Sequence, residues 1–398
     1  GMFNLLAILC ATGLGARYHC THKSAQLILK RPTYEFSVKL LDRVTQLTDA
    51  HFMFSPLSTW LQLLSLAEGA HGRTLKEIWT VTKHHRIKCF RRKWKLILNQ
   101  LDKEFRSVSN RRSFMIIDKL MDVKKPFLRE VQRLRSMEVM LLDFSYPVQA
   151  ADLANKHVAS ATNGEILDPF TPDDFNSTVL LTADTSYYRS FWKIPFNPVY
   201  TKPEKFYTEN SEVAGEVNMM NRVDYFNVTE IASIQAKVLE LPCGTDNRIS
   251  MLIFLPTGST IVDVFYLLPR IRLMTIFNMY RKGKPKLVNV KLPRFNINSD
   301  IDNVPELLHD MGIKRLFHPD LADLKGISDY KVYASLMTQV AKMEVTEVGV
   351  SASIVADFLI TNQISEEFLA NRPFAYMLVD RKSELILYAG MYSKPSLF

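Results

Sequence analysis

The densest group of chemically active side chains lies between Lys83 and Lys95, with His84 and His85 beside it. Lysine and arginine attract anions, and the planar guanidinium of arginine can hold a sulfate, phosphate or carboxylate with two hydrogen bonds. The cluster indicates either a polyanion-binding surface or a solvated basic face without a ligand. Its members are Lys83, Arg86, Lys88, Arg91, Arg92, Lys93 and Lys95.

Motifs for catalysis or metal binding are missing from the sequence. It contains no HExxH, CxxC, P-loop or GxSxG pattern. His85 and Cys89 are one helical turn apart, but the basic residues around them would repel a cation. A catalytic triad is recognised by geometry, which a sequence does not contain. The residues give no support for an enzyme, and we expect no metal and no cofactor.

The second informative stretch runs from Met343 to Phe358. After the single glycine Gly349, apolar and polar residues alternate, with Val355 as the exception. A period of two is typical of a strand with one buried face. Two interpretations remain open, namely a strand followed by an exposed loop, and a loop that can itself become a strand. The apolar members of the alternation are Val350, Ala352, Ile354, Ala356 and Phe358.

Helical patterns dominate the first half of the chain, and strand patterns dominate the second half. Helices are predicted from apolar residues spaced near 3.6, and strands from apolar runs or alternation between polar turns. This separation favours an α+β fold with mostly antiparallel sheets. The predicted helices follow Ser55 and cover 92–105 and 151–161, and the predicted strands cover 237–242, 249–256, 287–292, 374–379 and 385–389.

The first residues are typical of a secretory signal. Residues 2–16 form an uncharged apolar run that ends in small residues, although no lysine or arginine precedes it. The alternative is a buried first helix. We expect a signal peptide over 1–16 and a secreted, extracellular protein. Secretion would make Asn176 and Asn227, each in an Asn-x-Thr sequon, N-glycosylation sites.

Composition and cysteine content describe a soluble chain stabilised by its core. The 398 residues are 47% hydrophobic and 23% charged, which excludes disorder. Two or three domains are expected at about 150 residues each, but no Pro/Gly/Ser-rich linker divides the chain. If Cys10 leaves with the signal, Cys20, Cys89 and Cys243 remain, so at least one is a free thiol or bridges to another molecule. The net charge of +9 favours anionic partners without identifying one.

Beyond these patterns, the chain resembles a known family, the serpins, from about Tyr34 to Pro395. About a dozen short motifs carry the resemblance. Each is weak alone, but all of them occur in the family's order. They are 52–58 with 69–74, 162–166, Phe191-Trp192 with Phe196 and Thr201, 217–220, 241–242, 251–256, 292–295, Leu307 with 311–313, Glu347 with Gly349, 371–374, 386–390 and Pro395.

The resemblance implies one domain over 17–398, with three β-sheets, eight or nine helices and an exposed reactive loop at about 347–372. It also implies a suicide-substrate mechanism. A serine protease cleaves the loop and forms an acyl-enzyme, and the loop then inserts into the main sheet and distorts the attached protease. The chain is the substrate in that reaction, so no catalytic residue is expected in it. The alternative is a non-inhibitory serpin that acts as a binding or carrier module.

The family pattern makes Gly349 the hinge and Val350 the first residue to insert. No proline interrupts the loop before Pro373, which favours insertion. The bulky Ile354, Val355 and Phe358 disfavour it, because inhibitory hinges usually carry small residues and overfilling costs about 1–3 kcal/mol. The hinge assigned by the resemblance comprises Glu347, Gly349, Val350, Ser351, Ala352, Ser353, Ile354, Val355 and Ala356.

The bond that a protease would cleave is predicted within two residues. Counting forward from Gly349 reaches Gln363 before Ile364, and counting back from Pro373 reaches Asn362. Neither Asn362 nor Gln363 suits a trypsin-like pocket with an acidic floor. The target protease therefore stays open.

The resemblance also implies a gate beneath the main sheet, at Ser55, Ser58, Asp184 and Gln339. Asp184 stands where the family has asparagine, Gln339 stands where it has histidine, and Ser190 nearby replaces a glycine. In the family the two gate partners share a hydrogen bond that controls sheet opening. We expect the Gln339 amide to donate to the Asp184 carboxylate instead, with altered switching.

In the serpin layout the basic cluster lies on the helix where several members bind heparin-like polysaccharides. The resemblance therefore points to Arg91, Arg92, Lys93 and Lys95 as polysaccharide contacts. We expect a serine protease as partner and a heparin-like polysaccharide as a second one. Secretion argues against nucleic acid, no further apolar run is long enough to span a membrane, and we expect a monomer.

Overall fold

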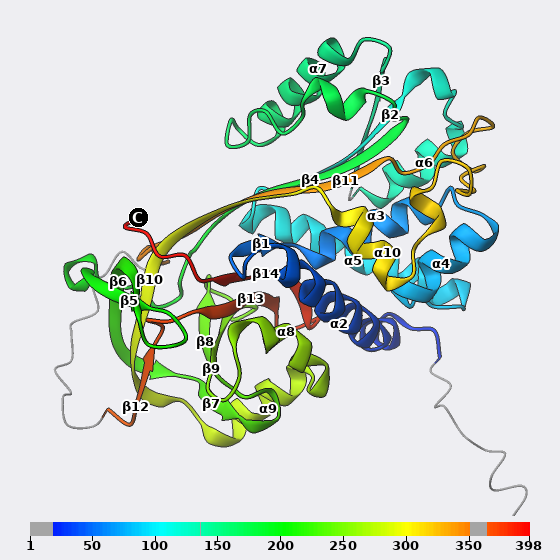
Figure 1. Cartoon of the computed structure of the whole chain (residues 1–398). Coiled ribbons are helices and arrows are strands. Elements are labelled where there is room, and N and C mark those ends of the chain that lie inside the picture. The colour runs from blue at the N-terminus through cyan, green and yellow to red at the C-terminus, as the bar shows by residue number, and fades with distance from the viewer. Residues whose placement is uncertain (1–18, 136, 351–363) are drawn as a thin grey trace, which may run out of the picture.

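The computed structural model describes residues 19–135, 137–350 and 364–398. Within them the chain forms nine α-helices and fourteen β-strands, an α+β architecture (Figure 1). The helices are α2 (His22–Leu47), α3 (Pro56–Ala67), α4 (Gly72–Thr82), α5 (Lys88–Val108), α6 (Lys125–Leu134), α7 (Pro147–Ala161), α8 (Val264–Leu267), α9 (Leu273–Gly283) and α10 (Val304–Met311).

The strands fall into three sheets. One has the order β1-β14-β13-β9-β8-β7. The other two share the long strand β10, whose residues 295–301 pair with β11 and whose residues 286–294 pair with β6. The strands are β1 (Phe52–Phe54), β2 (Arg112–Asp118), β3 (Glu138–Leu142), β4 (Leu180–Arg189), β5 (Lys202–Tyr207), β6 (Val213–Phe226), β7 (Val228–Ile231), β8 (Ala236–Cys243), β9 (Ile249–Pro256), β10 (Lys286–Ile301), β11 (Leu336–Val345), β12 (Glu366–Leu369), β13 (Phe374–Asp380) and β14 (Leu385–Tyr392).

The main sheet, β3-β2-β4-β11-β10, is covered on both faces (Figure 1). Leu181 and Ala183 of β4 pack in a cluster with α7, whereas Leu180 and Tyr188 belong to the larger core on the opposite face. Burial on both faces removes the polar-apolar alternation of a strand. This explains why β2 and β4 were absent from the sequence prediction, which placed mainly helices in the first half.

The predicted helices are confirmed, but they begin or end at other residues. α5 begins at Lys88 rather than Arg92, and α7 begins at Pro147 rather than Ala151. α3 begins at Pro56, and Ser55 caps it, because the Ser55 hydroxyl accepts a hydrogen bond from the Ser58 amide at 3.1 Å. Each first turn buries a single residue, Phe90 in α5 and Ala150 in α7, so it carries little periodic signal and the sequence prediction began both helices late.

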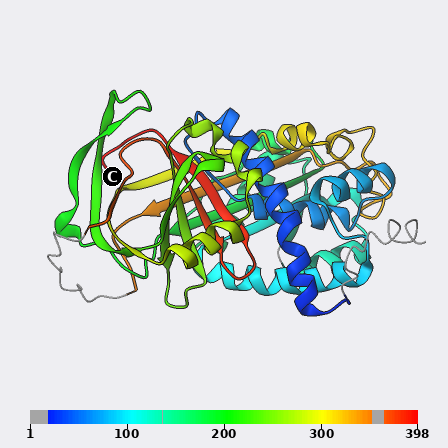
Figure 2. The same cartoon turned by 90° about the horizontal axis from the view of Figure 1, so that it is seen from below.

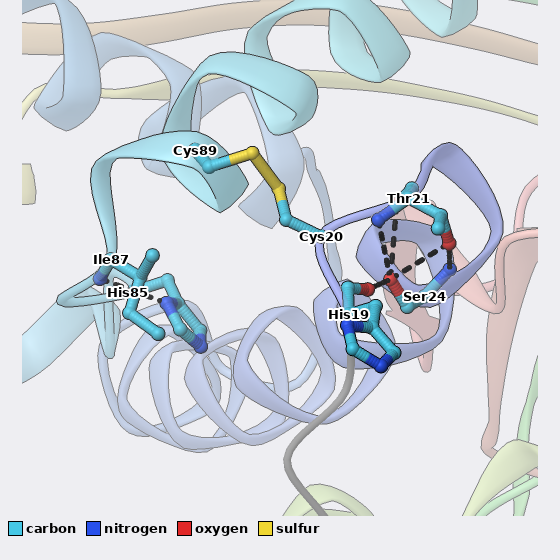
Figure 3. Close-up of a disulfide and its surroundings, with 7 residues drawn as sticks. All are labelled: His19, Cys20, Thr21, Ser24, His85, Ile87 and Cys89. Atoms are coloured by element: carbon cyan, nitrogen blue, oxygen red, sulfur yellow. Dashed lines mark hydrogen bonds between the residues drawn. A yellow bond between two sulfur atoms is a disulfide. The ribbon is translucent and has the colours of Figure 1, made fainter.

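A disulfide joins Cys20, just before α2, to Cys89 in the first turn of α5 (Figure 3). Cys89 therefore has no thiol for a metal, and the neighbouring His85 Nδ1 accepts a hydrogen bond from the Ile87 amide at 3.0 Å. Among the described cysteines Cys243 is the free thiol, and burial raises its pKa to about 12. The bridge fixes the start of α2, which continues past β14 (Figure 2).

Two further observations concern membranes and metals. Among the residues with assigned structure, no helix is both long and apolar enough to span a bilayer. In the same part of the chain, no three histidine, cysteine or carboxylate side chains gather as a metal site would require.

Candidate functional site

The centre of the main sheet holds an internal pair of parallel strands. β4 and β11 are hydrogen-bonded to each other from Leu181 opposite Leu336 to Arg189 opposite Glu344. Their outer neighbours, β2 and β10, run antiparallel to them. A strand placed between β4 and β11, antiparallel to both, would replace one parallel ladder with two antiparallel ladders, which are slightly more stable per residue. We call the junction between these two strands the β4–β11 slot.

The chain that leaves β11 is held against Trp192, which is buried just beyond the end of β4. The Trp192 amide donates to the Val348 carbonyl at 3.1 Å, and the Val350 amide donates to the Trp192 carbonyl at 2.9 Å. The indole Nε1 of Trp192 donates to the Thr346 carbonyl at 2.6 Å. These three hydrogen bonds fix residues 346–350 at the carboxyl ends of β4 and β11. We call residues 346–350 the hinge segment.

Gly349 is required by the close approach of this backbone. A Cβ atom at this position would lie 2.5 Å from the Trp192 carbonyl oxygen and 2.8 Å from the Cβ of Pro195. Ser190, the residue that replaces a family glycine, adds a further contact. Its hydroxyl oxygen accepts a hydrogen bond from the Thr346 amide at 2.9 Å. The hinge segment is therefore held more tightly than a glycine at position 190 would allow.

Glu347 is buried although it is charged. Its Oε1 accepts a hydrogen bond from the Thr201 hydroxyl at 2.8 Å and lies 3.5 Å from Nη1 of Arg294 on β10. Arg294 also donates from Nε to the Phe398 carbonyl at 2.8 Å. Thr201 and Arg294 appeared in the sequence motifs, but their roles were missed, because distant sequence positions give no signal of pairing.

Most of the predicted reactive loop lies outside the described residues. This applies to residues 351–356 of the predicted hinge and to the candidate cleavage-site residues Asn362 and Gln363. Ile364 is described and 37% exposed. It precedes β12, which pairs in parallel with β10. The two described flanks of the loop are thus anchored at Trp192 and at β10.

The predicted hydrogen bond between Gln339 and Asp184 is wrong. The two residues lie opposite each other across the slot, but the Gln339 amide is fully used by α3. Its Oε1 accepts from the Ser55 amide at 2.8 Å, and its Nε2 donates to the Ser55 carbonyl at 2.7 Å and to the Thr59 hydroxyl at 2.9 Å. Both amide hydrogens are committed, so none is left for Asp184.

Asp184 is paired with a buried arginine. Its Oδ1 lies 3.1 Å from Nε of Arg111, and the Ser186 hydroxyl donates to its Oδ2 at 3.3 Å. Burial raises the pKa of Asp184 above its usual range, although the positive charge of Arg111 opposes that shift. Arg111 also binds Ser58 and Asp102. Neither Arg111 nor Asp102 was predicted, because an arginine pair after Asn110 resembles an exposed turn.

The basic cluster divides into committed and exposed side chains. The guanidinium of Arg91 lies 5.0 Å from the centre of the Trp79 ring, and its Nη1 donates to the His85 carbonyl at 2.9 Å. Lys95 pairs with Glu68 at 2.5 Å and also lies 3.8 Å from Glu130. Lys93 is half-buried. The exposed basic residues at the start of α5 and just before it are Arg86, Lys88 and Arg92.

The two sequons differ in the freedom of their asparagines. Asn176 is exposed, and its amide donates to Asp173 Oδ1 at 3.2 Å, a contact on the surface. Asn227 is half-buried, and its Nδ2 donates to Oε1 of the buried Glu240 at 3.0 Å. A glycan on Asn227 would displace that hydrogen bond.

Comparisons with known proteins agree with this geometry. A family model described as Serpin (serine protease inhibitor) matches residues 32–395. Mouse neuroserpin is 28% identical over 363 residues, which cover 87% of this chain and 87% of the relative. A crystal structure of maspin matches with a TM-score of 0.81 at 22% identity, covering 94% of this chain and all of maspin. The structure of native protease nexin-1 with heparin matches with a TM-score of 0.79 at 24% identity, covering 93% and 99%. At 22% and 24% identity, these two structural matches show that the chain has the same fold as maspin and protease nexin-1.

Proposed function

Because the chain belongs to the serpin family of serine protease inhibitors, we propose that it is a secreted inhibitor that traps a serine protease by loop cleavage and insertion. The observation that carries the proposal is the direct parallel pairing of β4 and β11. The hinge segment continues directly from β11, at the carboxyl ends of the two strands that border the slot. A severed loop that folds back along β11 would therefore enter antiparallel to both strands.

The chemistry belongs to the protease, and this chain supplies its substrate. The protease serine attacks the carbonyl carbon of the bait bond, the amine of the downstream fragment leaves with a proton, and an ester joins the protease to the upstream fragment. Insertion of the loop then carries the attached protease away from its starting position. Distortion of the protease active site would slow the hydrolysis of the ester, so the covalent complex persists.

Trapping is tested by incubating the protein with a panel of serine proteases. The expected result is a covalent band that survives SDS, together with release of the fragment downstream of the cut. The mass of that fragment assigns the cleaved bond among Asn362, Gln363 and Ile364. A panel that yields only clean cleavage, with no covalent band, would favour the alternative of a non-inhibitory binding or carrier module.

A polyanion-binding role is a second proposal, favoured by the exposed Arg86, Lys88 and Arg92. One structural relative carries heparin in its description. We expect alanine at these three positions to lower the salt concentration for elution from heparin markedly, because exposed charges bind polyanions through screened electrostatics. The matched control replaces Arg91 and Lys95, whose charges are committed internally, and should shift elution much less. Equal shifts in both variants would contradict the assignment.

N-glycosylation is expected at Asn176 and not at Asn227. The Asn176 side chain is exposed, whereas the Asn227 amide binds the buried Glu240. On secretion from eukaryotic cells, Asn176→Gln should remove the mass of one glycan and Asn227→Gln should remove none. Gel mobility before and after enzymatic deglycosylation measures both. A glycan lost in the Asn227→Gln variant would contradict this prediction.

A further inference from the structure

A buried charged cluster lies beneath the β4–β11 slot. Arg111 is 1% exposed, Asp184 is 2% exposed and Asp102 is 4% exposed. They come from three places in the chain, namely the segment after α5, strand β4 and helix α5 itself. We propose that Arg111 is a positioning residue for sheet opening, because it fastens β4 to the helices below through Asp184. The inference rests on the proposed function, since sheet opening is the step that it controls.

The contacts of Arg111 point in two directions. Its Nε donates to the Ser58 hydroxyl of α3 at 2.6 Å and lies 3.1 Å from Asp184 Oδ1 on β4. Its Nη1 pairs with Asp102 on α5. One guanidinium therefore joins β4 to α3 and to α5. Arg111 and Asp184 are both buried, and hydrogen bonds between charged groups are stronger in the protein interior than at the surface.

β11, the other strand that borders the slot, is held to α3 by a separate set of hydrogen bonds. Gln339 of β11 makes all of its amide hydrogen bonds to Ser55 and Thr59 at the start of α3. Asp184 and Gln339 face each other in register, yet Asp184 is held by Arg111 and Gln339 by Ser55 and Thr59, rather than by each other. Opening the slot therefore breaks no side-chain bond between these two residues. It does require β4 to move relative to α3, and the Arg111–Asp184 pair opposes that movement.

The charges of the cluster allow a clean substitution. Two carboxylates surround one guanidinium, so removing one carboxylate leaves a balanced ion pair rather than an isolated buried charge. Burial already raises the pKa of Asp184, which means that its ionised form is costly to bury. Asp184→Asn should therefore fold, whereas removal of Arg111 would leave two buried carboxylates without their guanidinium and destabilise the protein.

The test measures how fast the slot accepts a strand. A fluorescent synthetic peptide with the sequence of residues 350–361 is incubated with the intact protein, and its uptake is followed on native gels. We expect Asp184→Asn to take up the peptide about tenfold faster than the starting protein, which corresponds to about 1.4 kcal/mol of lost resistance to opening. Asp102→Asn keeps the link to β4 and should show a smaller acceleration.

Thr182→Val is the matched control, because Thr182 is a buried β4 residue outside the cluster. It should take up the peptide within about twofold of the starting protein. Denaturation midpoints of the variants separate slot opening from global stability. The inference would be overturned if Asp184→Asn and Asp102→Asn accelerated peptide uptake equally. It would also be overturned if the uptake rates of the variants simply followed their denaturation midpoints. If the starting protein takes up no peptide and gains no heat resistance on loop cleavage, the proposed function itself fails, and the inference fails with it.

Discussion

Cleavage within residues 351–363 is expected to raise the unfolding temperature by about 20 °C or more. Insertion of the loop would add roughly ten net backbone hydrogen bonds, each worth about 1 kcal/mol. In a domain of this size, each kcal/mol raises the unfolding temperature by about 2 °C. The gain comes from replacing the single β4–β11 ladder with two antiparallel ones. Calorimetry before and after cleavage by a protease that is not trapped measures the change. An unchanged unfolding temperature would exclude insertion and favour the binding module.

Val350→Arg is the control for that experiment. Val350 is the first inserting residue in the family's pattern, and its side chain would face the core beneath the slot. An unpaired guanidinium there would cost several kcal/mol, so the cleaved variant should gain little heat resistance. A full rise in the cleaved Val350→Arg protein would mean that the stabilisation comes from something other than insertion.

Glu347→Lys is expected to release the hinge segment and to make the protein aggregate during incubation near 37 °C. The substitution removes the acceptor for Thr201 and places an ammonium beside Arg294. The Arg294 side chain is 36% exposed, so the main loss is the hydrogen bond from Thr201 to the buried carboxylate, about 1.5–3 kcal/mol. Without this contact the hinge segment would separate from β10, and the loop of another molecule could then insert between the carboxyl ends of β4 and β11. Native gels over time should show a ladder of oligomers.

Glu347→Gln separates the charge from the hydrogen bond. The amide oxygen can still accept from Thr201, and no like charge faces Arg294. We expect this variant to remain monomeric over the same period, with at most a small loss of stability. If both variants form oligomers equally fast, the carboxylate itself controls the hinge. If neither does, the Glu347 contact does not restrain the hinge at all.

The fold could be predicted from the sequence where polar residues alternate with apolar ones, as in β10, or where a polar turn separates two apolar runs, as between β13 and β14. β10, β13 and β14 gave readable strand patterns, and the family motifs in order predicted the three sheets. β2 and β4, which α7 and the central core bury on both faces, were not predicted as strands. The number of helices followed from the resemblance, whereas the first turns of α5 and α7 could not be predicted from apolar spacing.

The site was predictable in its residues and not in its contacts. Gly349 and Glu347 were identified from the motif, but the close approach of Trp192 that requires glycine was not. Asp184 and Gln339 were named as gate partners and lie opposite each other in β4 and β11, yet the bond predicted between them is absent. The sequence shows which groups can bond, and only the structure shows that Ser55 and Thr59 already use the Gln339 amide.

The pairing of β12 with β10 has a consequence for the fate of a cleaved molecule. β12 is anchored from Val288 opposite Glu366 to Lys291 opposite Leu369, and every residue of β13 and β14 is buried. The piece downstream of a severed peptide bond therefore supplies two interior strands. It would stay associated without any covalent link, so a nicked molecule would migrate as one particle in gel filtration and separate into two chains only when denatured.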